Sequence, residues 1–246
     1  MDYLFALQNI RETAPDFINY FFIIVSEYFI LAGFIIPAVI YWAVDKSAGA
    51  TIIFGYSFSY ELNQTIKNIA CVYRPWIKDP RLYVQAHAVK SATGYSFPSG
   101  HTTTAASIYG GISVWQKKRR IVVICMTLLI VLTAFARNWL GAHTLKDVVC
   151  AVILVALWLS VLYIVKFWVS KNPARDKVIC IFGIVFALLL LGYLCMKKYP
   201  LDYTSDGQLL ADPYLMLNDC FTACGCFTGS LSGWWLERHV VKFSTQ

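Results

Sequence analysis

Charged side chains are scarce in this chain, and their scarcity excludes an ordinary soluble domain. Only 14% of its 246 residues are charged and 58% are hydrophobic, whereas soluble domains carry about 25% charged residues. The acidic residues form no cluster of the kind that holds a divalent metal, so we expect no metal ion and no cofactor. The net charge of +7 requires no nucleic acid partner, because membrane topology and anion binding account for it.

The chain also lacks a recognisable disulfide framework, although it has eight cysteines. Those inside apolar runs are Cys125, Cys150, Cys180 and Cys195. A free thiol in such a run packs as a small hydrophobic group. Cys220, Cys224 and Cys226 share one apolar stretch, but no histidine or carboxylate pattern beside them supports metal binding. We therefore interpret these cysteines as packing residues.

Long apolar stretches dominate the sequence and predict a membrane protein. A helix needs about 20 apolar residues to cross a bilayer. The stretches expected to do so are 17–43, 47–70, 100–116, 120–138, 145–169, 178–196 and 209–236. Residues 1–16 are expected to form an interfacial segment. We predict a single all-α domain over 1–246, a polytopic bundle of membrane helices.

The last predicted span carries a ridge of small residues. Gly225, Gly229 and Gly233 recur every four residues, and such a ridge lets another helix approach closely. The neighbour is either another helix of the same chain or a second copy in a homodimer.

Basic residues gather in the loops on one side of the predicted spans. They are Lys46, Lys117, Lys118, Arg119, Arg120, Lys171, Arg175, Lys177, Arg238 and Lys242. The positive-inside rule assigns this side to the cytoplasm. The opposite side also has cations, but Arg74 and Arg137 among them belong to polar motifs that explain their presence. We expect a plasma membrane protein whose polar motifs face the extracytoplasmic side.

Two of these motifs lie beside the second and third predicted spans. Lys67 ends the second span and Arg74 follows it; alone, the two are better explained as cations that reach lipid headgroups. Ser99 and Gly100 open the third span, where Ser99 predicts a helix N-cap and the free N–H groups of a helix start bind anions. An ordinary capped helix with His101 in its first turn explains this second motif equally well.

The third motif lies between the fourth and fifth predicted spans. Arg137 ends the fourth span, His143 begins the fifth, and Asp147 follows His143 on the same helical face. A carboxylate held against one imidazole nitrogen fixes the tautomer and leaves the other nitrogen free to attack. Taken alone, this pair is better explained by the acidic residues that are common at helix starts.

The three motifs in this order are far more specific than any one of them. They read Lys67-x6-Arg74-Pro75, Pro98-Ser99-Gly100-His101 and Arg137-x5-His143-x3-Asp147. The series resembles the signature of the type 2 phosphatidic acid phosphatase superfamily, whose site is shared with the vanadium haloperoxidases. One departure is Ala136, which stands where that family usually has serine. The resemblance covers residues 67–147 and implies a six-helix phosphatase core, to which the chain adds one further helix.

The resemblance implies a metal-independent phosphatase that forms a phospho-histidine. His143 would attack phosphorus, Asp147 would orient it, and His101 would protonate the leaving oxygen. The phosphoryl oxygens would be held by Lys67, Arg74, Arg137 and the N–H groups of Ser99 and Gly100. Fixed cations would then supply the charge stabilisation that magnesium supplies in other phosphoryl-transfer enzymes.

The expected substrate is a lipid phosphate, because the motifs lie at the ends of membrane spans. Candidates are undecaprenyl pyrophosphate, phosphatidylglycerophosphate, phosphatidic acid and sphingoid phosphates. Lys78, Arg81 and Lys90 either meet a second phosphate or are solvated loop charges. A phosphotransferase and a non-catalytic lipid-phosphate binder or transporter are the alternative functions. Glu27, inside an apolar span, is a candidate partner for a pocket cation, with a structural role as the default.

Overall fold

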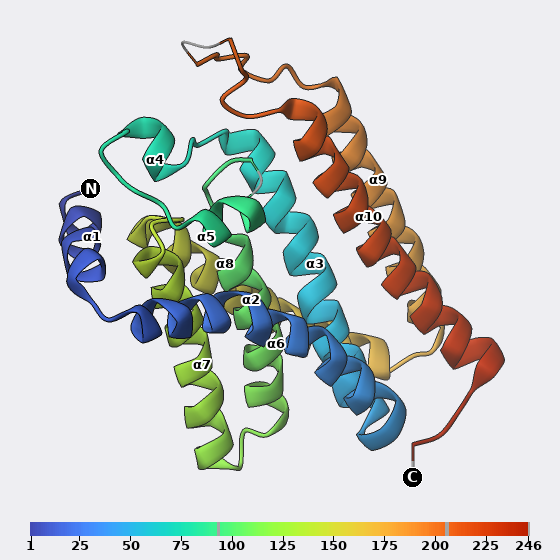
Figure 1. The fold of residues 1–246 in the computed structure, drawn as a ribbon. Coiled ribbons are helices and arrows are strands. Elements are labelled where there is room, and N and C mark those ends of the chain that lie inside the picture. Colours follow the sequence, from blue (N-terminus) through green and yellow to red (C-terminus); the bar gives the residue numbers. More distant parts are fainter. Residues whose placement is uncertain (93, 205–206, 246) are drawn as a thin grey trace.

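The protein is built almost wholly of helices. The computed structural model describes residues 1–92, 94–204 and 207–245, without the side chains of 29–34 and 90–91. The helices are α1 (Asp2–Thr13), α2 (Asp16–Val39), α3 (Lys46–Ala70), α4 (Pro75–Lys78), α5 (Ala86–Ser91), α6 (Gly100–Trp115), α7 (Arg120–Trp139), α8 (Leu145–Ser170), α9 (Ala174–Met196) and α10 (Pro213–Leu236). Two π-helical turns, Ile40–Val44 and Glu237–Val241, extend α2 and α10. These ranges contain no strand, so the predicted all-α bundle is confirmed (Figure 1).

Within the described residues, the seven long helices follow the seven predicted spans, except that α9 begins four residues earlier and α10 four residues later than predicted. The predicted span began at residue 209, whereas α10 begins at Pro213. Asp212 caps the helix there, because its side chain accepts a hydrogen bond from the Tyr214 N–H group (2.8 Å). The preceding residues form a turn in which the Leu210 N–H group donates to the Asp202 carbonyl (2.9 Å).

Within the described residues, three helices, α7, α8 and α9, are long and apolar enough to cross a membrane. Their outer faces expose large apolar side chains, for example Ile121, Leu157 and Leu189, which are 78%, 60% and 69% exposed. Water does not favour apolar surface of this extent, whereas lipid does. The chain is therefore a membrane protein.

α3 and α6 lie side by side at the centre of the bundle. α6 packs against α2, α3, α7 and α8, while α9 and α10 form a hairpin that packs on α3. Glycine permits two of the close approaches. An added Cβ at Gly111 would lie 3.0 Å from the Ile52 side chain, and one at Gly183 would lie 2.5 Å from that of Leu231.

The helix connections separate into two ends of the bundle. Figure 1 shows α4, α5 and the turn between α7 and α8 at one end, and the α6–α7 and α8–α9 connections with the C-terminus at the other. All three polar motifs therefore lie at one end, and the basic loops Lys117–Arg120 and Lys171–Lys177 lie at the opposite end. This arrangement matches the predicted alternation of spans, and the assignment of each end to a side of the membrane stays a prediction.

The predicted interfacial segment forms a helix that docks on the rest of the chain. Arg11 of α1 is buried and donates hydrogen bonds to the carbonyls of Trp139 (2.6 Å) and Tyr83. α1 thus joins the end of α7 to the segment between α4 and α5, beside the polar motifs.

The glycine ridge of α10 faces away from the bundle. An added Cβ at Gly225, Gly229 or Gly233 would meet no atom of the described chain within 4 Å. A neighbouring helix within this part of the chain is therefore excluded, and the homodimer through the ridge stays a prediction.

Candidate active site

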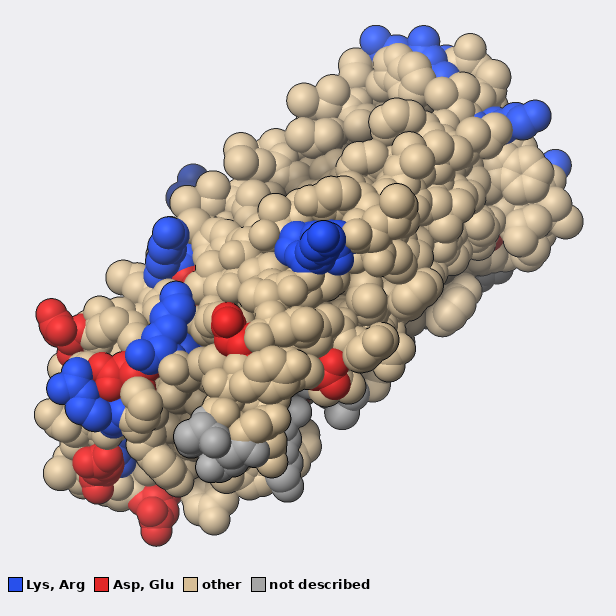
Figure 2. All heavy atoms as spheres, turned by 90° about the horizontal axis from the view of Figure 1, so that it is seen from above, with Lys and Arg blue, Asp and Glu red and all other residues tan. Residues whose placement is uncertain are grey.

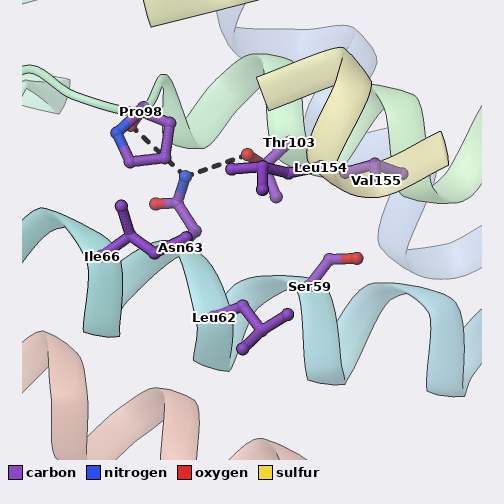
Figure 3. Close-up of a pocket in the computed structure, with 8 residues that line it drawn as sticks. All are labelled: Ser59, Leu62, Asn63, Ile66, Pro98, Thr103, Leu154 and Val155. Carbon is purple, nitrogen blue, oxygen red and sulfur yellow. Dashed lines mark hydrogen bonds between the residues drawn. The ribbon is translucent and has the colours of Figure 1, made fainter. Parts of the chain in front are cut away.

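A polar clamp between α3 and α6 positions the first two motifs. The side-chain amide of Asn63 donates to the Pro98 carbonyl (3.3 Å) and to the Thr103 hydroxyl (2.9 Å). Figure 3 shows this side chain reaching from α3 toward the start of α6. Lys67 is buried one turn further along α3, and an added Cβ at Gly100 would lie 3.4 Å from its Nζ atom. The ammonium group therefore faces the first turn of α6.

That first turn is capped as the sequence predicts. The Ser99 hydroxyl accepts a hydrogen bond from the Thr102 N–H group (3.4 Å). The N–H group of Ser99 itself donates to the Asp147 carbonyl (3.1 Å), so a phosphate contact there would have to share or replace that bond. The N–H groups of Gly100 and His101 belong to the first turn, where no intrahelical acceptor is available.

Arg74 lies between the first and third motifs. It is buried, and its guanidinium donates to the carbonyls of Gly94 (2.8 Å) and Ala142 (3.2 Å). Its Nη1 atom also lies 2.8 Å from Nε2 of His143. Burial, followed by repulsion from Arg137, lowers the pKa of Arg74 to about 9, which leaves the guanidinium protonated at neutral pH.

The two ring nitrogens of His143 face different groups. Nε2 faces Arg74, whereas Nδ1 lies 3.6 Å from Oδ2 of Asp147 and 3.4 Å from the Ser96 hydroxyl. Ser96 donates to the same Asp147 oxygen (2.7 Å), and the Thr144 N–H group donates to it as well (2.7 Å). The carboxylate is thus fixed beside Nδ1, which favours the tautomer that carries a proton there and a lone pair on Nε2.

His143 is held in its neutral form by its surroundings. The ring is buried, and burial followed by the positive charges of Arg74, Arg137 and Lys67 lowers its pKa well below the ordinary value. All three predicted phosphate-binding cations therefore act on this one ring. A neutral imidazole is the form that can attack phosphorus.

Arg137 is fully buried, and the two edges of its guanidinium group differ. One edge has hydrogen-bond partners, and the other, called the open edge, has none among the described residues. Its Nη1 atom donates to the Ser26 hydroxyl (2.7 Å) and lies 3.4 Å from Oε1 of Glu27. Its Nε and Nη2 atoms have no hydrogen-bond partner among the described residues. Buried guanidinium donors without a partner are costly, and a bidentate phosphate would satisfy both.

Glu27 of α2 contacts two groups of the candidate site. Its Oε1 atom lies 3.7 Å from Nε2 of His101 as well as 3.4 Å from Arg137. From the sequence, an ion pair with a pocket cation is the lesser alternative for Glu27, and the structure shows that pair.

Two of the three cations considered for a second phosphate lie on the exposed surface. Arg81 is exposed and pairs with Asp79 (2.8 Å), and Lys78 is exposed as well. The side chain of Lys90 lies outside those described. Figure 2, which views this end of the bundle, shows charged side chains in separate groups on a largely uncharged surface. The solvated-loop interpretation therefore applies to Lys78 and Arg81.

Sequence reasoning missed four polar residues that support the site. Ser26, Asn63 and Ser96 contact site groups through their side chains, and Asn138 donates to the His143 carbonyl (2.8 Å). Asn63 precedes Lys67 by four residues, so helical spacing could have indicated it. No sequence spacing indicates Ser26, Ser96 or Asn138, because their partners lie far away in the sequence or on the other side of a turn.

Comparison with known proteins identifies the family. The model of the PAP2 superfamily matches residues 48–171, which is just over half of the chain and includes all three motifs. No curated protein and no solved structure matches the chain. The protein therefore belongs to the PAP2 superfamily, the type 2 phosphatidic acid phosphatases. Members of this superfamily are generally phosphatases, and the apolar helices place this one in a membrane.

Proposed function

We propose that the protein is a lipid phosphatase that hydrolyses a lipid phosphate monoester or a polyprenyl pyrophosphate without a metal ion. The observation that carries this proposal is the open edge of Arg137, a fully buried guanidinium with two unpartnered donors in the cation cluster that surrounds His143. A phosphoryl group bound to these donors would meet the lone pair of Nε2.

In this mechanism His143 is the nucleophile. The Nε2 lone pair attacks phosphorus while Arg74 transfers its N–H contact from Nε2 to a phosphoryl oxygen. The bond to the lipid oxygen breaks as His101 donates a proton to it. Asp147 stabilises the charge that develops on the ring, and a water molecule then attacks the phospho-histidine and releases inorganic phosphate.

The substrate is expected to reach the site from the membrane, because the motifs lie at one end of the helical bundle. The proposed location is the plasma membrane, with the site on the extracytoplasmic side. Undecaprenyl pyrophosphate remains among the candidates, but Lys78 and Arg81 give no support for a second phosphate.

The test is phosphate release from lipid phosphates in EDTA by purified wild type and His143→Ala. We expect the wild type to be active and the variant to lose roughly three orders of magnitude or more, because no neighbouring group can replace the nucleophile. His87→Ala, an exposed histidine on α5, is the matched control and should keep wild-type activity. Substantial turnover by His143→Ala would refute the mechanism, and lipid binding without turnover by the wild type would identify a binder instead.

A further inference from the structure

Glu27 places a carboxylate inside the candidate site. It belongs to a helix that carries none of the three motifs. It lies in α2, within a stretch that is otherwise apolar, and its side chain is 30% exposed. One of its oxygens, Oε1, is near three groups: Nη1 of Arg137 (3.4 Å), Nε2 of His101 (3.7 Å) and the Ser26 hydroxyl (3.4 Å). An ionisable residue inside an otherwise apolar stretch of a membrane protein points to a function.

The contact with Arg137 leaves the phosphate-binding edge of that residue untouched. Glu27 and Ser26 both approach Nη1, whereas Nε and Nη2 are the donors without a partner. A bound phosphate at the open edge would therefore not have to displace Glu27. The carboxylate can stay beside His101 during a catalytic cycle.

His101 needs such a neighbour because Arg137, the other partner of Glu27, is a cation and lies 3.4 Å from the same Oε1 atom. A cation close to an imidazolium repels it. Among these neighbours, Glu27 supplies the negative charge. A general acid must hold its proton until the leaving oxygen takes it.

We propose that Glu27 is the positioning residue for the general acid His101. The proposal rests on the phosphatase mechanism above. The carboxylate at Nε2 fixes a proton on that nitrogen and stabilises the imidazolium, so Nδ1 carries the proton that moves. Nδ1 gives this proton to the lipid oxygen as the bond from phosphorus to that oxygen breaks. The neutral Nδ1 atom then takes a proton from the water that attacks the phospho-histidine, which restores the imidazolium.

The experiment compares Glu27→Gln with wild type on two substrates, a lipid phosphate with an alkyl leaving group and an aryl phosphate with a good one. The amide keeps the shape of the side chain but not its charge. We expect kcat for the lipid phosphate to fall by roughly 10- to 100-fold with KM little changed, and kcat for the aryl phosphate to stay within about threefold. Glu61→Gln, a buried glutamate of α3 outside the site, is the matched control and should not alter the ratio of the two rates.

The same substitution in a His101→Ala background shows whether Glu27 acts through His101. We expect no further loss there, because the group that Glu27 positions is already absent. Equal losses on both substrates, a raised KM as the main effect, or an additive loss in the double variant would overturn the proposal. If the wild type and Glu61→Gln release no phosphate from either substrate, the proposed function fails instead, and the two failures are thus distinct.

Discussion

The two nitrogens of His143 show how one ring can be prepared for attack. Nδ1 faces Asp147 and Ser96, and Nε2 faces Arg74. The Asp147 oxygen nearest the ring accepts hydrogen bonds from Ser96 and from the Thr144 N–H group, so it cannot rotate away without losing both. Ser96 is itself anchored, because its N–H group donates to the Val72 carbonyl (2.7 Å). The orientation of the proposed nucleophile thus depends on a residue that no motif includes.

We expect Ser96→Ala to reduce kcat for a lipid phosphate about tenfold and to leave KM nearly unchanged. The variant removes one hydrogen bond to a charged oxygen, which is worth about 1.5–3 kcal/mol at most, and about 1.4 kcal/mol corresponds to tenfold in rate. The measurement is steady-state kinetics on purified protein.

Ser107→Ala is the matched control for this prediction. Ser107 is equally buried, but its hydroxyl donates to the Thr103 carbonyl within its own helix, α6 (2.7 Å). Equal kinetic constants for the Ser96 and Ser107 variants would show that the Ser96 contact has no role in orienting the nucleophile.

Among the elements, hydropathy predicted helices that face lipid better than helices that face protein. α7, α8 and α9 match the predicted spans and have strongly apolar compositions. α3 was predicted as an apolar span, yet it buries Ser57, Glu61, Gln64 and Asn68 at helical spacing. Asn68 contacts the Cys220 sulfur of α10 (3.1 Å), so this polar face lies against protein. A hydropathy value averaged along the sequence does not reveal such a polar face, because contacts between helices decide which side chains are buried.

The clamp from α3 to α6 depends on the side chain of Asn63. We expect Asn63→Leu to raise KM for a lipid phosphate about tenfold, since it removes two hydrogen bonds that hold the start of α6 beside Lys67. Thermal unfolding in detergent should also shift to lower temperature, because the Pro98 carbonyl and the Thr103 hydroxyl lose their partner. The measurements are steady-state kinetics and a melting curve.

Asn68→Leu separates the two effects of that change. Asn68 is a buried asparagine on the same helix, but it contacts α10 instead of α6. Its loss should lower the melting temperature and leave KM unchanged. A similar rise in KM for both variants would show that the clamp does not position the phosphate site.

Across the whole molecule, the site joins residues that the chain keeps far apart. Lys67 and His143 come from different ends of the motif series, and Glu27 lies 110 residues from its partner Arg137. The order of the three motifs predicted that they meet in one site, because it resembles the signature of a known family. It could not predict the contribution of Ser26, because α2 carries no motif and its approach to α6 and α7 is a matter of packing. Glu27 was indicated only by its position inside an apolar stretch.

The orientation of the bundle in the membrane can be tested by labelling its two ends. The basic loops and the polar motifs lie at opposite ends, and the positive-inside rule puts the basic loops in the cytoplasm. In a background without reactive native thiols, we expect Arg81→Cys to react with a membrane-impermeant thiol reagent in intact cells and Lys118→Cys to react only after the cells are opened. Both positions are exposed, so accessibility to the reagent reports the side of the membrane and not burial. Labelling of Lys118→Cys but not Arg81→Cys in intact cells would invert the topology. The phosphatase would then act on lipid phosphates of the cytoplasmic leaflet, and recycling of an extracytoplasmic polyprenyl pyrophosphate would be excluded as its function.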